Sequence, residues 1–410
     1  MSMQFPVANP PQDEGPERFD PALLTQSAAM RLVWFEKECL IEHARLTQAC
    51  SAILQTICSP GEGAGFNRLG TMVLVIGPAR VGKTTLIEEL KKRLLERARE
   101  RMMHDPSHLP FVSVNAPEAG SGRFNWVDYY TAVLRAVNYP FLHREKMGVR
   151  VRDLREAMEE ALIHHQPYAV IVDEAHHLAK AASGRGLQDQ LDHLKYLENR
   201  TGVCHVLVGT YEMRRFRTVT AQLAGRSIDV HFPRYDATVK EDREEFRSTL
   251  WALQRQLPVE EEPLLAEYSW EMLYARSMGC IGLLKLHLNR ALSLALTEEA
   301  STVTEDHLKA TATSEDRLKE MVNTALKGEE DLMEAKGADE RLLTLLGLRE
   351  PEMLLKRGAT PSEATHDRSK AASSFHGRKP GDRKPVRDPI GPQPDHTQAD
   401  GDEDKHRIAG

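Results

Sequence analysis

One ten-residue stretch carries the clearest chemical signal in this 410-residue chain. It fits the pattern G-x-x-x-x-G-K-[ST] and reads Gly77-Pro78-Ala79-Arg80-Val81-Gly82-Lys83-Thr84-Thr85-Leu86. Glycines let the backbone curl so that several N–H groups face one anion. In such a loop the lysine reaches the β- and γ-phosphates of a nucleotide, and the hydroxyl after it ligates Mg²⁺. The spacing therefore predicts a cradle for a nucleoside triphosphate at residues 77–85, with Lys83 and Thr84 in these two roles.

A second signal is a pair of adjacent carboxylates after an apolar run. Residues 169–172 read Ala-Val-Ile-Val, and Asp173 and Glu174 follow directly. We expect Asp173 in the Mg²⁺ shell and Glu174 as the general base that polarises the attacking water, an effect worth about 10²–10⁴-fold in rate. An apolar run that ends in Asp-Glu is common by itself. Downstream of the phosphate loop it indicates ATP hydrolysis to ADP and phosphate.

The same carboxylates begin a motif with another interpretation. Residues 173–176 read Asp-Glu-Ala-His, the motif that names one group of helicases. Such helicases need two similar ATPase lobes, whereas this sequence predicts one lobe. His176 and His177 could also be metal ligands, but adjacent helical positions point apart. Surface or packing histidines are the favoured interpretation.

Three further residues are candidates for sensing or stabilising the terminal phosphate. Thr210 follows an apolar run and is a candidate γ-phosphate sensor; a residue that begins a turn is the alternative. Arg226 is a candidate arginine finger, offered to a neighbouring subunit's nucleotide and worth about 10³–10⁵ in rate. Lys285 lies where a second sensor would touch the γ-phosphate. The alternative for Arg226 is an ordinary surface arginine, and the alternative for Lys285 is a solvated helix residue.

The elements around these residues predict an α/β fold. Five short apolar runs alternate with helical patterns, at residues 72–76, 111–114, 168–172, 203–208 and 228–232. This alternation is typical of a parallel sheet covered by helices on both faces, with its ligand beyond the carboxyl ends of the strands. We therefore expect a five-stranded parallel sheet sandwiched by helices. From residue 240 the strand signal disappears, which predicts a small all-helical C-terminal lid domain.

Composition sets the expected domain boundaries. They are a disordered N-terminus at 1–24, a helical segment and linker at 25–62, an ATPase domain at 63–238, a helical lid at 239–326, a helical extension at 327–355 and a disordered tail at 356–410. The tail is poor in large apolar residues and cannot bury enough surface to fold alone.

The bulk properties describe an ordinary soluble chain. Its net charge is −7, and 41% of its residues are hydrophobic. Its five scattered cysteines suggest reduced thiols, so we expect a cytoplasmic protein with no membrane partner. Contact with DNA would need a local basic surface, for which Arg123, Lys180 and Arg185 are the candidates; solvated surface charges are the alternative. The basic run at 378–387 is a candidate for binding DNA or docking onto a partner enzyme, or a solubilising tail.

Taken together, these motifs resemble the AAA+ ATPases, and more narrowly the TnsC/TniB transposition regulators. The narrower resemblance rests on residues 114–118 and 124–126, 191–195 with 206–212, and 222–227 with 231–235. Many relatives have two adjacent arginines where this chain has Gly225-Arg226. AAA+ proteins more often have arginine at the position of Lys285.

The resemblance implies an AAA+ P-loop NTPase that uses ATP and Mg²⁺ and assembles as a ring or filament on double-stranded DNA. Such assemblies recruit transposase subunits and a target-selecting protein, and ATP acts as a switch that biases assembly. Two other functions remain open. One is a nucleotide-switched protein adaptor or signalling ATPase without DNA binding, and the other is a replication initiator or helicase loader.

Overall fold

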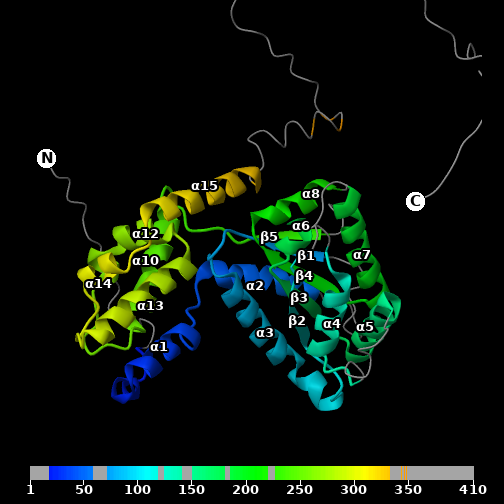
Figure 1. Ribbon diagram of the computed structural model, residues 1–410, viewed down its shortest axis with the longest axis horizontal. Coiled ribbons are helices and arrows are strands. Elements are labelled where there is room, and N and C mark those ends of the chain that lie inside the picture. Colours follow the sequence, from blue (N-terminus) through cyan, green and yellow to red (C-terminus); the bar gives the residue numbers. More distant parts are fainter. Residues whose placement is uncertain are drawn as a thin grey trace, which may run out of the picture. The chain divides into compact units, whose positions relative to one another are not determined.

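The computed structural model describes residues 18–58, 72–118, 124–140, 150–180, 185–219 and 227–332, together with positions 343, 346 and 348. Residues 1–338 form one compact unit, and residues 339–410 form another. Figure 1 labels most of the helices and strands of the first unit. Among the described residues, no helix combines the length and the apolar character needed to cross a bilayer.

A five-stranded sheet forms the centre of the first part of this unit. Its strands lie in the order β2-β3-β4-β1-β5 and are all parallel. Their bounds are β1 (Met72–Ile76), β2 (Phe111–Asn115), β3 (Ala169–Asp173), β4 (Cys204–Gly209) and β5 (Ser227–His231). The predicted five-stranded parallel sheet is therefore confirmed. Because parallel strands share a direction, the residues after β1, β3 and β4 meet at one edge.

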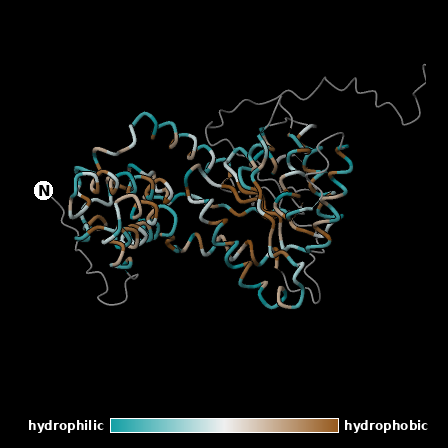
Figure 2. Tube along the Cα trace, turned by 60° about the horizontal axis from the view of Figure 1, so that its bottom comes forward, coloured by the Kyte–Doolittle hydropathy of each residue, from teal (hydrophilic) through white to brown (hydrophobic). Residues whose placement is uncertain are grey.

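Both faces of the sheet are buried by helices. Alternate residues of β1 enter different clusters: Val73 and Val75 pack with α2 (Ala44–Ile57) and α3 (Lys83–His104). Met72, Leu74 and Ile76 pack on the opposite face. That face is covered by α4 (Trp126–Ala136), α5 (Val151–His165) and α7 (Arg185–Thr201). This alternation follows from the pleat of a strand, and Figure 2 shows the hydrophobic residues concentrated along the strands.

Short elements follow β3 and β4. They are α6 (His176–Lys180) after β3, and η2 (Tyr211–Arg214) and α8 (Arg215–Val219) after β4. Helices α6 and η2 begin within three residues of the strand ends, and α8 follows η2 directly, so these elements lie at the edge where the predicted chemistry is placed.

The helical lid has a core of its own. It contains α10 (Lys240–Arg255), α11 (Leu265–Tyr268), α12 (Trp270–Ser277), α13 (Ile281–Thr297) and α14 (Glu305–Ala310). The helix α1 (Ala28–Lys37) belongs to this core, because Phe35 is buried among Leu250 and Leu288. The expected N-terminal segment at 25–62 is therefore divided: α1 packs on the lid, and α2 packs on the sheet.

Two of the expected boundaries need correction. Residues 18–24 are not disordered: η1 (Pro21–Thr25) is a 3₁₀ helix, and Phe19 and Leu23 are only 3% and 6% exposed. These two apolar side chains stabilise the segment by burial, which the Pro-rich composition concealed. The boundary expected at 326/327 falls inside α15 (Glu315–Leu332), whose buried residues Ala325 and Gly328 continue the helix past it. The expected tail at 356–410 and most of the extension lie outside the described residues.

Candidate nucleotide-binding site

The phosphate loop connects β1 to α3 through a backbone that needs glycine at two positions. Gly82 precedes α3 with φ +118°, in the left-handed region that side chains disfavour. Gly77 lies so close to Phe232 that a Cβ there would be 2.2 Å from the carbonyl oxygen. The first N–H groups of α3 have no partner within the helix, and they carry the positive end of its dipole. The loop therefore has the backbone of an anion cradle.

The Lys83 ammonium lies inside the curl of this loop. It donates to the carbonyl oxygens of Pro78 and Gly77, at 2.8 and 3.3 Å. Burial lowers the pKa of Lys83, and the nearby charges of Glu174 and Asp173 oppose that effect. A half-buried cation at the N-terminus of α3 favours a ligand with several negative charges.

The two carboxylates reach the same edge from β3. Burial raises the pKa of Asp173, whose Oδ1 accepts a 2.7 Å hydrogen bond from the Glu174 N–H. Glu174 has φ +52°, which is uncommon for a residue with a side chain, and its side chain is 54% exposed. The turn thus keeps Asp173 close to Lys83 and presents Glu174 toward solvent, as a base that activates water requires.

Thr210 is brought beside the phosphate loop by strand register. Ile76 of β1 pairs with Gly209 of β4, and the Gly77 N–H donates to the Gly209 carbonyl at 3.3 Å. In the described part of the chain, the buried Thr210 Oγ1 has no hydrogen-bond partner. An unsatisfied buried hydroxyl costs about 1–3 kcal/mol. This atom is therefore suited to a ligand, as expected of a γ-phosphate sensor.

Lys285 does not take the expected position of a second sensor. Its Nζ donates to the carbonyl oxygens of Glu36 and Cys39, at 2.9 and 2.6 Å. These carbonyls lie at the C-terminal end of α1, where a helix attracts cations. The ammonium therefore anchors α1 to α13 and is not directed at the phosphate loop. The sequence offered no sign that α1 would pack here.

The residue of α13 that meets the phosphate loop is Gly282, which the sequence analysis missed. A Cβ at this position would lie 2.4 Å from the Arg80 carbonyl oxygen and 3.4 Å from the Gly82 nitrogen. Cys280, directly before α13, is fully buried. The only sequence signal was a glycine in the first turn of a helix, where it is unfavourable unless another backbone comes close.

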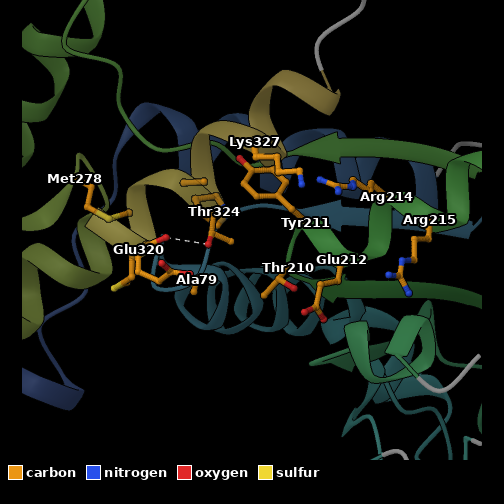
Figure 3. Close-up of a pocket in the computed structure, with 13 residues that line it drawn as sticks. Ala79, Thr210, Tyr211, Glu212, Arg214, Arg215, Met278, Glu320, Thr324 and Lys327 are labelled. Carbon is orange, nitrogen blue, oxygen red and sulfur yellow. Dashed lines mark hydrogen bonds between the residues drawn. The ribbon is translucent and has the colours of Figure 1, made fainter. Parts of the chain in front are cut away.

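A cavity of about 380 Å³ opens beside the phosphate loop and Thr210 (Figure 3). Pro78 and Ala79 line it from the loop, and Thr210 and Tyr211 line it from the end of β4. The opposite wall is α15, which contributes Glu320, Met321, Thr324, Ala325 and Lys327. No pattern in the sequence predicted that α15 would lie at this site.

The donor set around the loop fits Mg²⁺. The Thr84 hydroxyl and the Asp173 carboxylate are hard oxygen ligands of the kind this ion prefers. Within the described ranges, no cluster of three or more His, Cys, Asp or Glu side chains could hold a metal. Mg²⁺ is commonly held by one or two protein ligands together with waters and substrate phosphates. Thr84 and Asp173 would thus hold the ion, which would neutralise charge on the phosphates.

The remaining candidates are not brought to this site by the described structure. Arg226 and Arg123 lie outside the described residues, as does the basic run at 378–387. Arg185 begins α7, but its side chain is outside the described part. Lys180 ends α6 and forms a half-exposed ion pair with Glu212, at 3.2 Å. The two histidines His176 and His177 stack on each other.

Comparison with known proteins identifies the domain that contains this site. Residues 67–216 match the model of the family described as AAA domain. The sheet order, the phosphate loop after β1 and the helical lid make the fold that of an AAA+ P-loop NTPase. The match ends at the level of the AAA domain and does not single out the transposition regulators. None of the curated proteins matches the chain significantly.

Several solved structures are similar to the chain. The Aeropyrum pernix ORC1 protein in complex with DNA has 19% identity and a TM-score of 0.48, with 68% of each chain covered. The Aeropyrum pernix ORC2 protein, in ADPNP–ADP complexes, has 18% identity and a TM-score of 0.47, with 68% of this chain and 70% of that chain covered. Drosophila ORC bound to DNA has 12% identity and a TM-score of 0.42, with 85% and 88% covered.

Proposed function

We propose that the AAA domain at residues 67–216 binds and hydrolyses ATP, and that ATP controls the assembly of the protein on double-stranded DNA. The observation that carries the first half is the meeting of Lys83, Asp173 and Thr210 at one sheet edge, where the Thr210 hydroxyl has no partner among the residues that the structure describes. These groups match the charge of a triphosphate, the ion that accompanies it and its terminal oxygens.

Each residue then has a defined task in hydrolysis. The N–H groups of residues 79–85 and the Lys83 ammonium hold the β- and γ-phosphates in place. Glu174, exposed at the turn after β3, accepts the proton of the attacking water. Thr210 contacts the γ-phosphate and so reports whether it is present.

Self-assembly follows from the expected role of Arg226. In this proposal Arg226 reaches the nucleotide of a neighbouring copy and stabilises charge on the terminal phosphate. Each site is then complete only between two subunits. ATP favours assembly, and hydrolysis favours release.

We propose regulation of transposition as the biological role, in which the DNA-bound assembly recruits a transposase and responds to a target-selecting protein. This role is supported by the resemblance of the short sequence segments named above, from residues 114–118 to residues 231–235, to TnsC/TniB proteins. A replication initiator or helicase loader accounts equally well for the AAA domain, ATP use and DNA contact. A nucleotide-switched protein adaptor accounts for the AAA domain without DNA.

The test is electron microscopy and sedimentation of the purified protein with ATP, Mg²⁺ and duplex DNA. We expect nucleotide-dependent assemblies on DNA and an affinity for DNA that falls steeply with salt, because phosphate contacts release counterions. Binding of ATP without any effect of DNA would favour the adaptor. Stimulation of strand transfer by a transposase encoded beside this protein would separate the transposition role from replication initiation. A protein that has no affinity for ATP with Mg²⁺ would overturn the whole proposal.

A further inference from the structure

The helix α15 connects the lid to the edge of the sheet that carries the nucleotide site. Near its start, Arg276 of α12 donates to the Thr313 carbonyl at 3.1 Å and lies 3.7 Å from the Glu315 carboxylate. The buried α15 residues Leu318 and Ala325 belong to the same hydrophobic cluster as Val81 and Phe232, beside the phosphate loop. Figure 1 shows α15 running from beside α12 toward β5.

The far end of α15 docks on the residue after Thr210. A Cβ at Gly328 would lie 2.1 Å from the ring of Tyr211, so only glycine permits this approach. Tyr211 is itself buried, and its hydroxyl lies 3.0 Å from His231 Nε2. The position of this aromatic ring is therefore coupled both to Thr210 and to α15.

Ion pairs fasten the same end of the helix. Arg234 and Glu329 form a pair at 3.1 Å, with side chains only 12% and 16% exposed. Arg214 pairs with Asp331 closer to the surface. These carboxylates belong to α15, and both arginines belong to the segments around the nucleotide site. The contact thus combines a tight apolar fit with complementary charge.

This arrangement makes α15 one wall of the cavity beside the phosphate loop. One wall of the cavity is Pro78, Ala79 and Thr210, and the other wall is α15. A cation supplied by a second copy must reach the terminal phosphate beside Thr210. While α15 lies on Tyr211, it faces Thr210 across this cavity.

We propose that α15 is an intramolecular strap that competes with a second copy of this chain for the surface formed by Tyr211, Arg214 and Arg234. With the strap docked, the protein is held as a single copy. Assembly requires the strap to leave this surface. The inference rests on the proposed function, because it presumes that a second copy completes the nucleotide site.

The test is a comparison of Gly328→Val with Asn323→Val, an exposed position of the same helix. Valine at 328 must displace α15 from Tyr211, whereas valine at 323 alters only the solvent-facing side. We expect Gly328→Val to lower the protein concentration needed for half-assembly with ATP and Mg²⁺ by about tenfold or more, equivalent to about 1.4 kcal/mol. Asn323→Val should assemble like the parent. Hydrogen exchange without nucleotide should be faster in residues 315–332 of Gly328→Val only.

Exchanging the charges of the Arg234–Glu329 ion pair gives a second, independent test. Glu329→Arg should promote assembly in the same way, because it sets two cations against each other in a mostly buried pair. Combining it with Arg234→Glu should restore the behaviour of the parent. This rescue distinguishes loss of the strap from general damage to the fold.

The outcomes separate the strap from the proposed function. If the parent assembles with ATP and Gly328→Val assembles equally or less well despite faster exchange of α15, the strap is wrong and the proposed function stands. If the parent stays single and Gly328→Val assembles, the strap is supported. If parent and variants bind ATP and all stay single, self-assembly itself is wrong and the competition is overturned with it.

Discussion

Oε2 of Glu174 lies 3.0 Å from Nδ1 of His176. The proposed general base is thus turned toward the first residue of α6. Burial lowers the pKa of His176, so its ring is neutral near pH 7 and does not cancel the charge of the carboxylate. The Glu174 carboxylate therefore lies beside an uncharged ring and not beside a cation.

Glu174→Gln should retain ATP binding and reduce hydrolysis by about 10²–10⁴-fold, because glutamine cannot accept a proton. The measurement is single-turnover hydrolysis beside nucleotide affinity, with exposed Glu160→Gln of α5 as the control. Rapid hydrolysis by Glu174→Gln would sink the assignment of the base.

Thr210→Val should change activity and stability in opposite directions. Loss of a hydroxyl that contacts the γ-phosphate should reduce the turnover of bound ATP by about 10²–10³-fold. Since that hydroxyl has no partner in the described residues, its removal should raise the free energy of unfolding by about 1 kcal/mol. Urea unfolding and turnover measure the two effects, and Thr297→Val on the exposed end of α13 is the control. A loss of stability with unchanged turnover would indicate a structural hydroxyl.

Gly282→Ala should weaken nucleotide binding although alanine favours helix. Its Cβ would lie 2.4 Å from the Arg80 carbonyl oxygen, so α13 and the phosphate loop must separate. Overpacking of this kind costs about 1–3 kcal/mol, or about 5- to 150-fold in affinity if the strain falls on the bound state. Titration with a fluorescent ATP analogue measures the nucleotide affinity, and Arg290→Ala on the exposed face of α13 is the control. Unchanged affinity would show that the loop does not depend on this contact.

Lys285→Met should lower stability and leave nucleotide affinity unchanged. Methionine keeps the length of the side chain but leaves the Glu36 and Cys39 carbonyls without their donor. The expected loss is about 1–3 kcal/mol of unfolding free energy. The opposite pattern, weaker ATP binding with unchanged stability, would restore Lys285 as a second phosphate sensor.

Stability should fall as the pH drops from about 6.5 toward 4. Burial is the main cause that lowers the pKa values of His43 and His193 to about 4, so the folded state stays neutral at pH values where the unfolded chain binds protons. More protons on the unfolded state means that stability rises with pH in this window. Urea unfolding at pH 7 and pH 5 measures how steeply the free energy of unfolding changes with pH. His193→Gln should make the slope shallower, and exposed His104→Gln should keep it; equal slopes in both variants would contradict the assignment.

The sequence was sufficient to predict the sheet and the phosphate loop, and the reasons are physical. Five apolar runs were long enough to be buried strands and were separated by helical spacing, so the parallel sheet was predictable. Gly82 and Lys83 belong to one continuous loop whose function depends on local backbone shape. Asp173 and Glu174 were identified because they end a strand in the same domain.

Residues whose role depends on another segment were not predictable in the same way. Lys285 lies at a plausible distance along the chain from the phosphate loop, but packing of α1 against α13 directs its ammonium to the Cys39 carbonyl. Phe19 and Leu23 lie in a Pro-rich stretch, and only the surface that buries them gives that stretch its structure.

The amino-acid sequence by itself was enough to predict the phosphate cradle and the carboxylates, because these depend on neighbours within a few positions. Only the tertiary structure decided that Gly282 rather than Lys285 meets the loop, and that α15 forms a wall of the cavity beside Thr210. Those two facts depend on contacts between segments about 100 to 200 residues apart, which are selected by burial and packing and leave no periodic signal in the chain.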